Sequence, residues 1–421
     1  MIKNWTFCYC FCCVTDIYFP VYNVNNFNTT VSKGAEMNSL TENLERHMTE
    51  LCLKIGSRHV GSTGEAAAAD YLENEFRKMG YETARECFPV TGWEFNSFEF
   101  VNLTQKRPVP GSIACFFSNS VEVEGKLLWL SSTDCEHLED FPVKDRICML
   151  ECWSVQSNIL GRNGLAETLD KMGALAAIFI SNWHLDFAPS SKIQRSPFLK
   201  TLGTLAVSFE GAYDLARHKE DTYFIRINAR NFPHQSPNVI ARRPGNGPRI
   251  VIGAHYDTAP LTQGAGDNAT GTAIVLEVAR LLKDIAPGVP VDFVEFSAEE
   301  YVPYHLQPGS EDYFKRHVAE GIKYFINIDD FGLLIGDPVI KLDYPEKLPE
   351  FKSKRYRFVS PDQSGDDRVF HENGIPNIWY YDINPFHQLH TPCDTLDCID
   401  FGKMTDCVLD IVDVVKQLEC K

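Results

Sequence analysis

The sequence predicts an α/β fold in which a mostly parallel central sheet is flanked by helices, with a β-rich α+β segment inserted into it. Apolar runs with the length and composition of buried strands occur at residues 249–254, 291–296 and 322–328. Between the first two runs, Ile274, Val278 and Leu281 repeat at helical spacing. Strands that alternate with helices in this way form parallel sheets covered on both sides.

Two helices are expected before the first of these strands. Residues 38–55 have a helical pattern, and Ser62 is a cap residue that opens a second helix. Gly80 is the expected stop of that second helix. A last amphipathic helix is predicted from the apolar positions Val408, Ile411, Val415 and Leu418.

Length and charge narrow the possible functions. At 421 residues the chain is long enough for two domains with cores of their own. The 57 acidic and 40 basic residues give a net charge of −17, and no basic block offsets it. We therefore expect no nucleic-acid partner, because phosphate binding needs concentrated Lys and Arg. No apolar stretch approaches the length that a membrane span requires, so we expect none.

Five potential metal ligands follow the predicted strands in series: His255, Asp267, Glu300, Asp329 and His390. Any one of them alone is more often a hydrogen-bonded loop residue or part of a solvated charge pair. Five together favour a site, because open α/β sheets build their sites at the carboxyl ends of the strands. Zinc accepts imidazole and carboxylate ligands together, and two zinc ions need about five of them, one bridging.

The motifs that contain these residues resemble those of the co-catalytic di-zinc aminopeptidases. That family includes bacterial leucyl aminopeptidases, glutamate carboxypeptidase, glutaminyl cyclase and the transferrin receptor. The resemblance covers residues 38–90 and 235–421, and it implies a zinc exopeptidase-like fold and a peptide substrate. The motifs are His255-x-Asp257, Gly264-Ala-x-Asp267-Asn268-x-x-Gly271, Glu299-Glu300, Asn327-x-Asp329-x-x-Gly332 and His390-Thr-x-x-Asp394-Thr395.

The resemblance also implies how the ligands are shared between two zinc ions in each catalytic domain. Asp267 would be the bridging carboxylate. His255 and Asp329 would complete one zinc site, and Glu300 and His390 would complete the other.

Three further acids have implied roles beside the metals. Glu299 resembles the general base; as the neighbour of a ligand, it is aimed at the same cavity and can move a proton from water to the leaving amine. Asp257, two residues from His255, can accept the second N–H of that imidazole and fix its tautomer. We expect Asp394 to orient His390 in the same way.

Two departures from the family pattern concern specificity. Residues 301–308 lengthen the segment between Glu300 and the following Gly-Ser pair. Asp367 stands where the family has a histidine near its substrate pocket. Asp366 and Asp367 are the carboxylates expected to hold the free ammonium group of a peptide. The alternative is that these two acids form an exposed turn.

The middle of the chain has a different rhythm of short strands and turns. Strands are expected at residues 125–130, 145–150 and 173–180, with a short helix at 166–172. This order resembles the protease-associated domain often inserted in the family; an inert β-rich insert is the alternative. We therefore predict a catalytic domain made of residues 37–91 and 234–421, with an insert at 92–233.

The first 36 residues differ in composition from the rest. A cluster of four cysteines between Cys8 and Cys13 lies among aromatic residues, and no clear cleavage site follows. We interpret residues 1–36 as a disordered tail or an over-extended start. The poorly formed signal sequence favours a cytoplasmic protein, whereas the sequons at Asn28 and Asn102 favour secretion.

Four functions are compatible with these motifs. The leading prediction is a zinc aminopeptidase that removes residues from the amino terminus of peptides. A glutaminyl cyclase-like enzyme with one zinc and a carboxypeptidase-like enzyme are alternatives, although no arginine cluster marks a pocket for acidic carboxyl termini. A non-catalytic, receptor-like relative would have lost ligands, and none is missing here. Side-chain preference and oligomeric state do not follow from the sequence.

Overall fold

The computed structural model describes residues 27–419 apart from residues 152–158, 181–198, 284, 286–287, 302–306, 354, 361–364 and 385–387. Residues 1–39 and 40–421 form two separate compact units. Helix α1 (Phe27–Met48) begins inside the predicted tail, while the four-cysteine cluster lies outside the described residues. The interpretation of residues 1–36 therefore stays a prediction. None of the helices described is long and apolar enough to cross a membrane.

The centre of the larger unit is a set of neighbouring parallel strands, as the sequence predicts. Their order is β14 (Asn377–Ile383), β11 (Ile322–Ile328), β9 (Arg249–His255) and β10 (Val291–Phe296). Antiparallel neighbours continue the sheet beyond both ends of this set: β12 (Asp337–Leu342) beside β14 and β8 (Thr222–Arg243) beside β10. β13 (Arg357–Val359) pairs with β12. The predicted α/β class is confirmed, within a mixed sheet of 14 strands.

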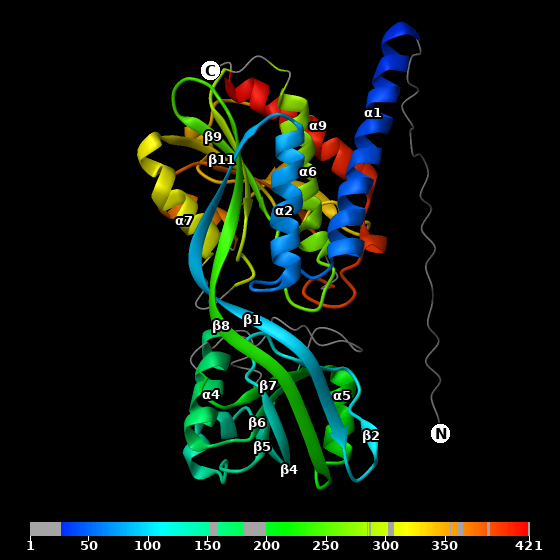
Figure 1. The fold of residues 1–421 in the computed structure, drawn as a ribbon, viewed down its shortest axis with the longest axis vertical. Helices are drawn as coiled ribbons and strands as arrows, with labels where there is room; N and C mark the ends of the chain where they lie inside the picture. The colour runs from blue at the N-terminus through cyan, green and yellow to red at the C-terminus, as the bar shows by residue number, and fades with distance from the viewer. Residues whose placement is uncertain are drawn as a thin grey trace, which may run out of the picture. The chain divides into compact units, whose positions relative to one another are not determined.

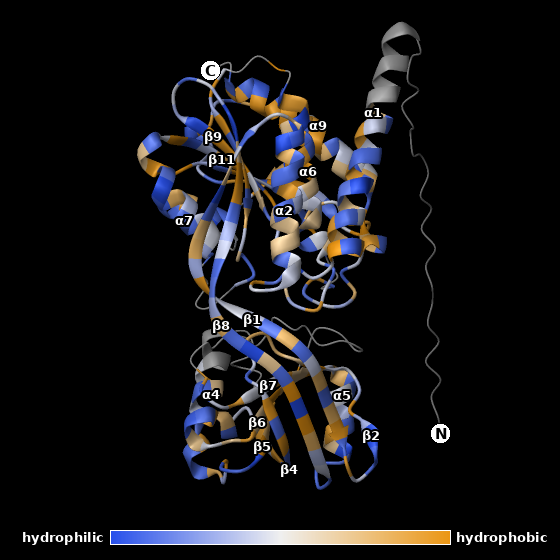
Figure 2. Cartoon of the chain, in the orientation of Figure 1, coloured by the Kyte–Doolittle hydropathy of each residue, from blue (hydrophilic) through white to orange (hydrophobic). Residues whose placement is uncertain are grey.

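Helices cover both faces of these strands. Figure 1 shows α7 (Pro308–His317) on one side of β9 and β11, and α2 (Thr63–Lys78), α6 (Thr270–Lys283) and α9 (Phe401–Glu419) on the other. Alternate residues of β9 serve the two faces: Ile250 and Ile252 pack with α2, α6 and α9, whereas Val251 packs with α7 and the short helix α8 (Asp367–Glu372). Because both faces are covered, most residues of these strands are apolar, although β10 also contains Asp292 and Glu295. The orange parts of β9 and β11 in Figure 2 show this apolar character.

The start of α2 matches its sequence signals. The Ser62 hydroxyl accepts the Glu65 N–H at 3.0 Å, and the Glu65 carboxylate reaches back to accept the Gly61 N–H at 2.8 Å. This reciprocal arrangement is close to a capping box and satisfies N–H groups at the helix start. Gly80 follows the helix with φ of 80°, in the left-handed region that glycine adopts without strain.

Two long strands connect the central strands to the middle of the chain. β1 (Glu82–Asn102) and β8 pair antiparallel from Glu82↔Arg242 to Asn102↔Tyr223. The later half of β8 also pairs with β10, and its first half pairs with β4 (Val121–Ser131). β4 continues through the parallel strands β5 (Ile147–Glu151), β6 (Ala176–Ile180) and β7 (Gly203–Val207), with β3 (Ser112–Ala114) antiparallel to β7 and β2 (Arg107–Pro108) paired to β1.

The predicted insert, residues 92–233, contains these middle strands. Helices α4 (Ile159–Met172) and α5 (Phe209–Arg217) accompany them, as Figure 1 shows. Its two predicted limits meet on the β1–β8 ladder, where Gly92 pairs with Phe232 and Thr91 with Pro233. Residues 40–421 nevertheless form one compact unit, so the division into two domains stays a prediction. Short turns of helix complete the described chain at Thr49–Ile55, Asp134–Glu136, Leu138–Asp140, Ala265–Ala269, Val318–Glu320, Pro345–Lys347 and Leu396–Cys398.

Phe293 provides a test of the packing between the sheet and α2. Its ring is fully buried on β10, with its centroid 5.4 Å from that of Tyr81 and 6.5 Å from that of Phe76. We expect Phe293→Ala to lower the free energy of unfolding by about 3–5 kcal/mol, because a large cavity remains. Urea denaturation followed by circular dichroism measures this change. Phe209→Ala, at an exposed site on α5, is the control, and an equal loss in both variants would contradict the packing argument.

Candidate metal centre and active site

The structure brings all five predicted ligands together at the carboxyl ends of the parallel strands. Their donor atoms form two groups, each within 4.8 Å: His255, Asp267 and Asp329 in one, and Asp267, Glu300 and His390 in the other. His255 ends β9, Asp329 directly follows β11, and Glu300 and His390 lie in the segments after β10 and β14. Asp267 lies in the short turn before α6.

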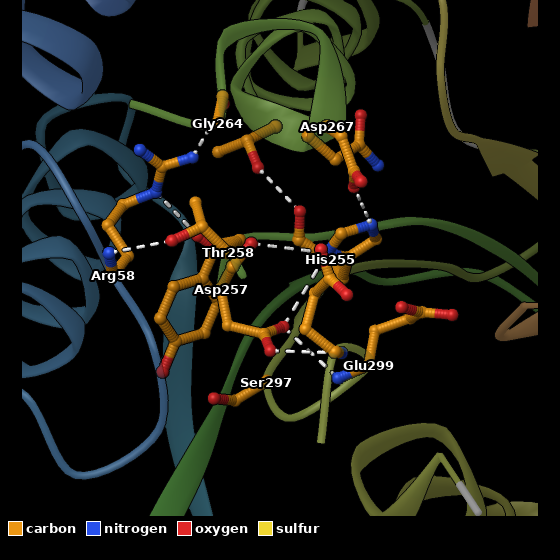
Figure 3. Close-up of polar contacts among 12 residues, drawn as sticks. Arg58, His255, Asp257, Thr258, Gly264, Asp267, Ser297 and Glu299 are labelled. Carbon is orange, nitrogen blue, oxygen red and sulfur yellow. Dashed lines mark hydrogen bonds and ion pairs between the residues drawn. The ribbon is translucent and has the colours of Figure 1, made fainter. Parts of the chain in front are cut away.

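Asp267 is the shared member of the two groups. Its Oδ1 lies 3.2 Å from Nε2 of His255, and its Oδ2 lies 2.7 Å from Nε2 of His390. A second carboxylate faces each imidazole: Asp329 Oδ1 is 3.2 Å from His255 Nε2, and Glu300 Oε1 is 3.0 Å from His390 Nε2. The carboxylate of Asp267 therefore points one oxygen at each half of the site, and Figure 3 shows it beside His255.

The site holds more buried negative charge than its histidines can balance. Asp267, Glu300 and Asp329 are each less than a tenth exposed. Burial alone would lower the pKa of His255 and His390, but the surrounding carboxylates, chiefly Asp329 for His255 and Glu300 for His390, raise both pKa values well above the usual range. A donor set of imidazoles and carboxylates with this excess of negative charge fits zinc.

Asp257 organises the backbone on both sides of the site. Its two carboxylate oxygens accept the N–H groups of Glu299 and Glu300, each at 3.1 Å. Figure 3 shows the Asp257 carboxylate beside Glu299. Its Oδ1 also lies 3.5 Å from Nδ1 of His255, the imidazole that the sequence predicts it to orient. The bonds to Glu299 and Glu300 were not predicted, because they join residues 42 and 43 positions apart in the sequence.

Glu299 reaches the site through a sharp turn. Ala298, which precedes it, has φ of 64°, and Asp257 fixes the peptide that follows. Burial raises the pKa of the Glu299 carboxyl well above its usual value, and the nearby carboxylates of Asp329 and Glu300 raise it further. Glu299 also lines the same cavity as the five predicted ligands.

Asp394 acts on a different partner from the one expected. Its Oδ1 accepts the Gly266 N–H at 2.7 Å and its Oδ2 accepts the Asp267 N–H at 3.2 Å. The carboxylate thus holds the turn that carries Asp267, whereas the sequence led us to place it against the imidazole of His390. Burial raises the pKa of Asp394 to about 7.

Sequence reasoning missed Arg58, whose side chain is wholly buried behind the site. Its guanidinium donates to the carbonyls of Tyr256 at 2.7 Å, Gln263 at 2.8 Å and Gly264 at 2.9 Å. These bonds fix the loop between His255 and Asp267, and Figure 3 shows Arg58 against Thr258 and Gly264. A single arginine between two helices belongs to no recognisable motif. Its acceptors are backbone carbonyls, which every residue has, so the sequence does not indicate them.

Glu65 is a second residue that the sequence did not point to as part of the site. Besides capping α2, its carboxylate accepts the Ser297 hydroxyl at 3.0 Å and lies 2.8 Å from Nε2 of His234 on β8. Ser297 begins the turn that delivers Glu299, and its N–H donates to Asn238 Oδ1 at 3.1 Å. The only sequence signal for Glu65 was its capping position, which indicates helix structure alone.

Asp366 and Asp367 are buried at the start of α8, each 1% exposed, so the exposed-turn alternative is wrong. Gly365 places this segment against the site: a Cβ atom there would lie 3.3 Å from Asp329 Oδ2 and 3.5 Å from Glu299 Oε1. Burial raises the pKa of both Asp366 and Asp367 to about 7. The lengthened segment after Glu300 falls mostly at residues 302–306, outside the described residues.

A cavity of about 230 Å³ opens above the ligands. Three of its lining residues were not predicted from the sequence: Lys341 on β12, and Trp379 and Tyr381 on β14. The full lining among the described residues is His255, Asp267, Glu299, Glu300, Gln307, Asp329, Asp330, Lys341, Gly365, Trp379, Tyr381 and His390.

Comparisons with known proteins identify the family of the chain and agree with its fold. Residues 238–415 match the model of peptidase family M28. The chain is 32% identical over 386 residues to "Aminopeptidase YwaD" of Bacillus subtilis. The aligned region covers 84% of this chain and 79% of the relative.

Solved structures show the same fold. The zinc aminopeptidase BSAP from Bacillus subtilis aligns with a TM-score of 0.71 at 19% identity, covering 90% of this chain and 94% of that one. A peptidase M28 precursor from Shewanella amazonensis aligns with a TM-score of 0.73 at 20% identity, covering 93% and 97%. The resemblance read from the motifs is confirmed, and the chain belongs to peptidase family M28.

Proposed function

We propose that this peptidase is an aminopeptidase that works with two zinc ions and cleaves the first residue from peptides. The observation that carries the proposal is Asp267, whose two oxygens face two different imidazoles at 3.2 and 2.7 Å. One carboxylate between two ligand sets is what a pair of zinc ions requires. The names of the relatives, an aminopeptidase and a zinc aminopeptidase, support the reaction and the metal.

Each residue of the site has a role in this reaction. Two zinc ions bound there would polarise the scissile carbonyl and make an attacking water more acidic. Glu299 accepts the proton of that water and returns it to the leaving amine. Asp257 holds the Glu299 backbone, so the base keeps its place beside the ligands. The buried carboxylates of Asp366 and Asp367 hold the free ammonium group of the substrate.

The alternatives differ from this proposal in ways that can be measured. A glutaminyl cyclase-like enzyme would need a single zinc ion, and a carboxypeptidase-like enzyme would not need a free amino terminus. A receptor-like relative would not turn over peptides at all. The complete set of five ligands, with the carboxyl of Glu299 lining the same cavity, favours a working hydrolase over a non-catalytic relative.

The zinc content tests the shared role of Asp267. We expect two zinc ions per chain after dialysis against metal-free buffer, with the zinc content measured by inductively coupled plasma mass spectrometry. His390→Ala should keep about one, because only one ligand group loses a member, whereas Asp267→Ala should lose both. The control is His218→Ala, at the residue that ends α5 and lies outside all of the metal-binding motifs. This variant should keep both zinc ions. A single zinc in the unchanged protein would favour the cyclase-like alternative.

Glu299 and Glu300 are adjacent, yet their substitutions should have different effects. Glu299→Gln should lower kcat by about 10²–10⁴-fold with zinc content unchanged, since a general base contributes about that much. Glu300→Gln should lower zinc content first, because Glu300 belongs to a ligand group. Steady-state kinetics and zinc analysis of both variants decide the matter. Loss of zinc in both would show that Glu299 is not a separate base.

The requirement for a free amino terminus tests the direction of cleavage. We expect a dipeptide to be cleaved and its N-acetylated form to resist, because the acetyl group removes the charge that Asp366 and Asp367 bind. Asp366→Asn should raise KM for the free dipeptide more than it lowers kcat. Chromatography of the released amino acid measures the cleavage rates of the free and the N-acetylated dipeptide. Equal cleavage of the two forms would reject an aminopeptidase while leaving a zinc hydrolase.

A further inference from the structure

One cation lies in the wall of the otherwise acidic cavity. Among the described lining residues, Lys341 is the single lysine or arginine, beside carboxylates that include Asp329 and Asp330. Lys341 is only 6% exposed, on β12. A lysine buried to this extent needs a defined environment, because taking an ammonium group out of water is costly.

The position of that ammonium is set by two aromatic rings. Nζ of Lys341 lies 3.5 Å from the ring centroid of Tyr381 and 3.9 Å from that of Trp379. The antiparallel register pairs Lys341 with Trp379, and Tyr381 lies two residues further along the same face of β14. Cation–π contacts of this kind help to fix the ammonium group at one point of the wall, and an ammonium group has three N–H donors, so it can also bond to a ligand there.

Trp379 offers a second donor in the same wall. It is 3% exposed, and its indole N–H is buried with no acceptor among the described residues. A buried N–H without a partner is uncommon in folded proteins and calls for an explanation. An acceptor carried by a ligand would supply the missing hydrogen bond.

We infer that Lys341 and Trp379 form a substrate subsite for a carboxylate, a property that rests on the proposed aminopeptidase function and goes beyond it. A carboxylate offers two acceptor oxygens, which matches one ammonium and one indole N–H. Lys341 is the single lysine or arginine among the described lining residues, so an anionic group of the substrate is directed to this wall. The carboxylate comes from an acidic side chain of the first residue or from the carboxyl terminus of a dipeptide.

Two pairs of substrates distinguish these sources. Glutamyl and glutaminyl anilides differ only in the side-chain carboxylate, and Leu-Gly and Leu-Gly-amide differ only in the terminal one. We expect the unchanged enzyme to prefer the carboxylate member of one pair, measured as a ratio of kcat/KM. In Lys341→Met that ratio should fall by about 10- to 100-fold, the usual effect of losing a hydrogen bond to a charged group. The affected pair identifies the source.

Further variants separate a subsite from a structural lysine. Lys341→Arg should retain most of the preference, because it keeps the charge. Lys347→Met is the matched control: its Nζ also lies over a ring, 4.0 Å from the centroid of Tyr344, but it does not line the cavity. Trp379→Phe keeps the ring, removes the N–H, and should lower the same ratio by a smaller factor. It also decides the matter if Lys341→Met fails to fold.

The inference and the proposed function fail in different ways. Chelator-sensitive cleavage of a leucyl anilide, which has no carboxylate, reports the aminopeptidase activity by itself. Its absence in the unchanged enzyme would reject the proposed function. Its presence, with both ratios unaltered in Lys341→Met and Trp379→Phe, would overturn the subsite and leave Lys341 as a counter-charge to the acidic cavity.

Discussion

The geometry of the site depends on one carboxylate that faces two imidazoles. Asp267 holds this place because the turn before α6 is fixed from two sides, by Asp394 on its N–H groups and by Arg58 on the carbonyls of the loop that precedes it. His255 ends β9 and Asp329 directly follows β11, two strands that the covered parallel sheet keeps rigid. Side-chain hydrogen bonds thus hold the irregular segment between β9 and α6.

Buried acids outnumber the available cations, and this imbalance links structure to chemistry. The carboxylates raise the pKa of both imidazoles, so binding of a metal ion at this site would be coupled to the release of protons. Burial and the same surplus raise the pKa of Glu299, which directly precedes Glu300 in the sequence. Lys341, which contacts the rings of Trp379 and Tyr381, is the single lysine or arginine in the described lining. One wall of the cavity is therefore basic, while the carboxylates lie elsewhere in the lining.

The sequence was sufficient for the features that depend on type and spacing. Apolar runs that end in His255, Glu300 and Asp329 predicted both the strands and the edge at which these residues meet. It was insufficient where a partner is distant or is a backbone atom. Asp257 binds N–H groups, Arg58 binds carbonyls, and Lys341 depends on a strand register that only the folded sheet reveals. The burial of Asp366 and Asp367 was likewise left open, because acidic residues before a short helix usually face solvent.

The ladder between β1 and β8 has a consequence for how such a chain can be rearranged. Gly92 and Phe232 are partners on one rung, so the two points where the chain leaves and re-enters the central strands are neighbours. Replacing everything between them with a tight hairpin would close no long loop and would leave the remaining rungs in register. We expect this rung to be an exchange point, at which a different middle segment could replace residues 93–231 provided that it also covers Val60 and Ala298, which pack against that segment.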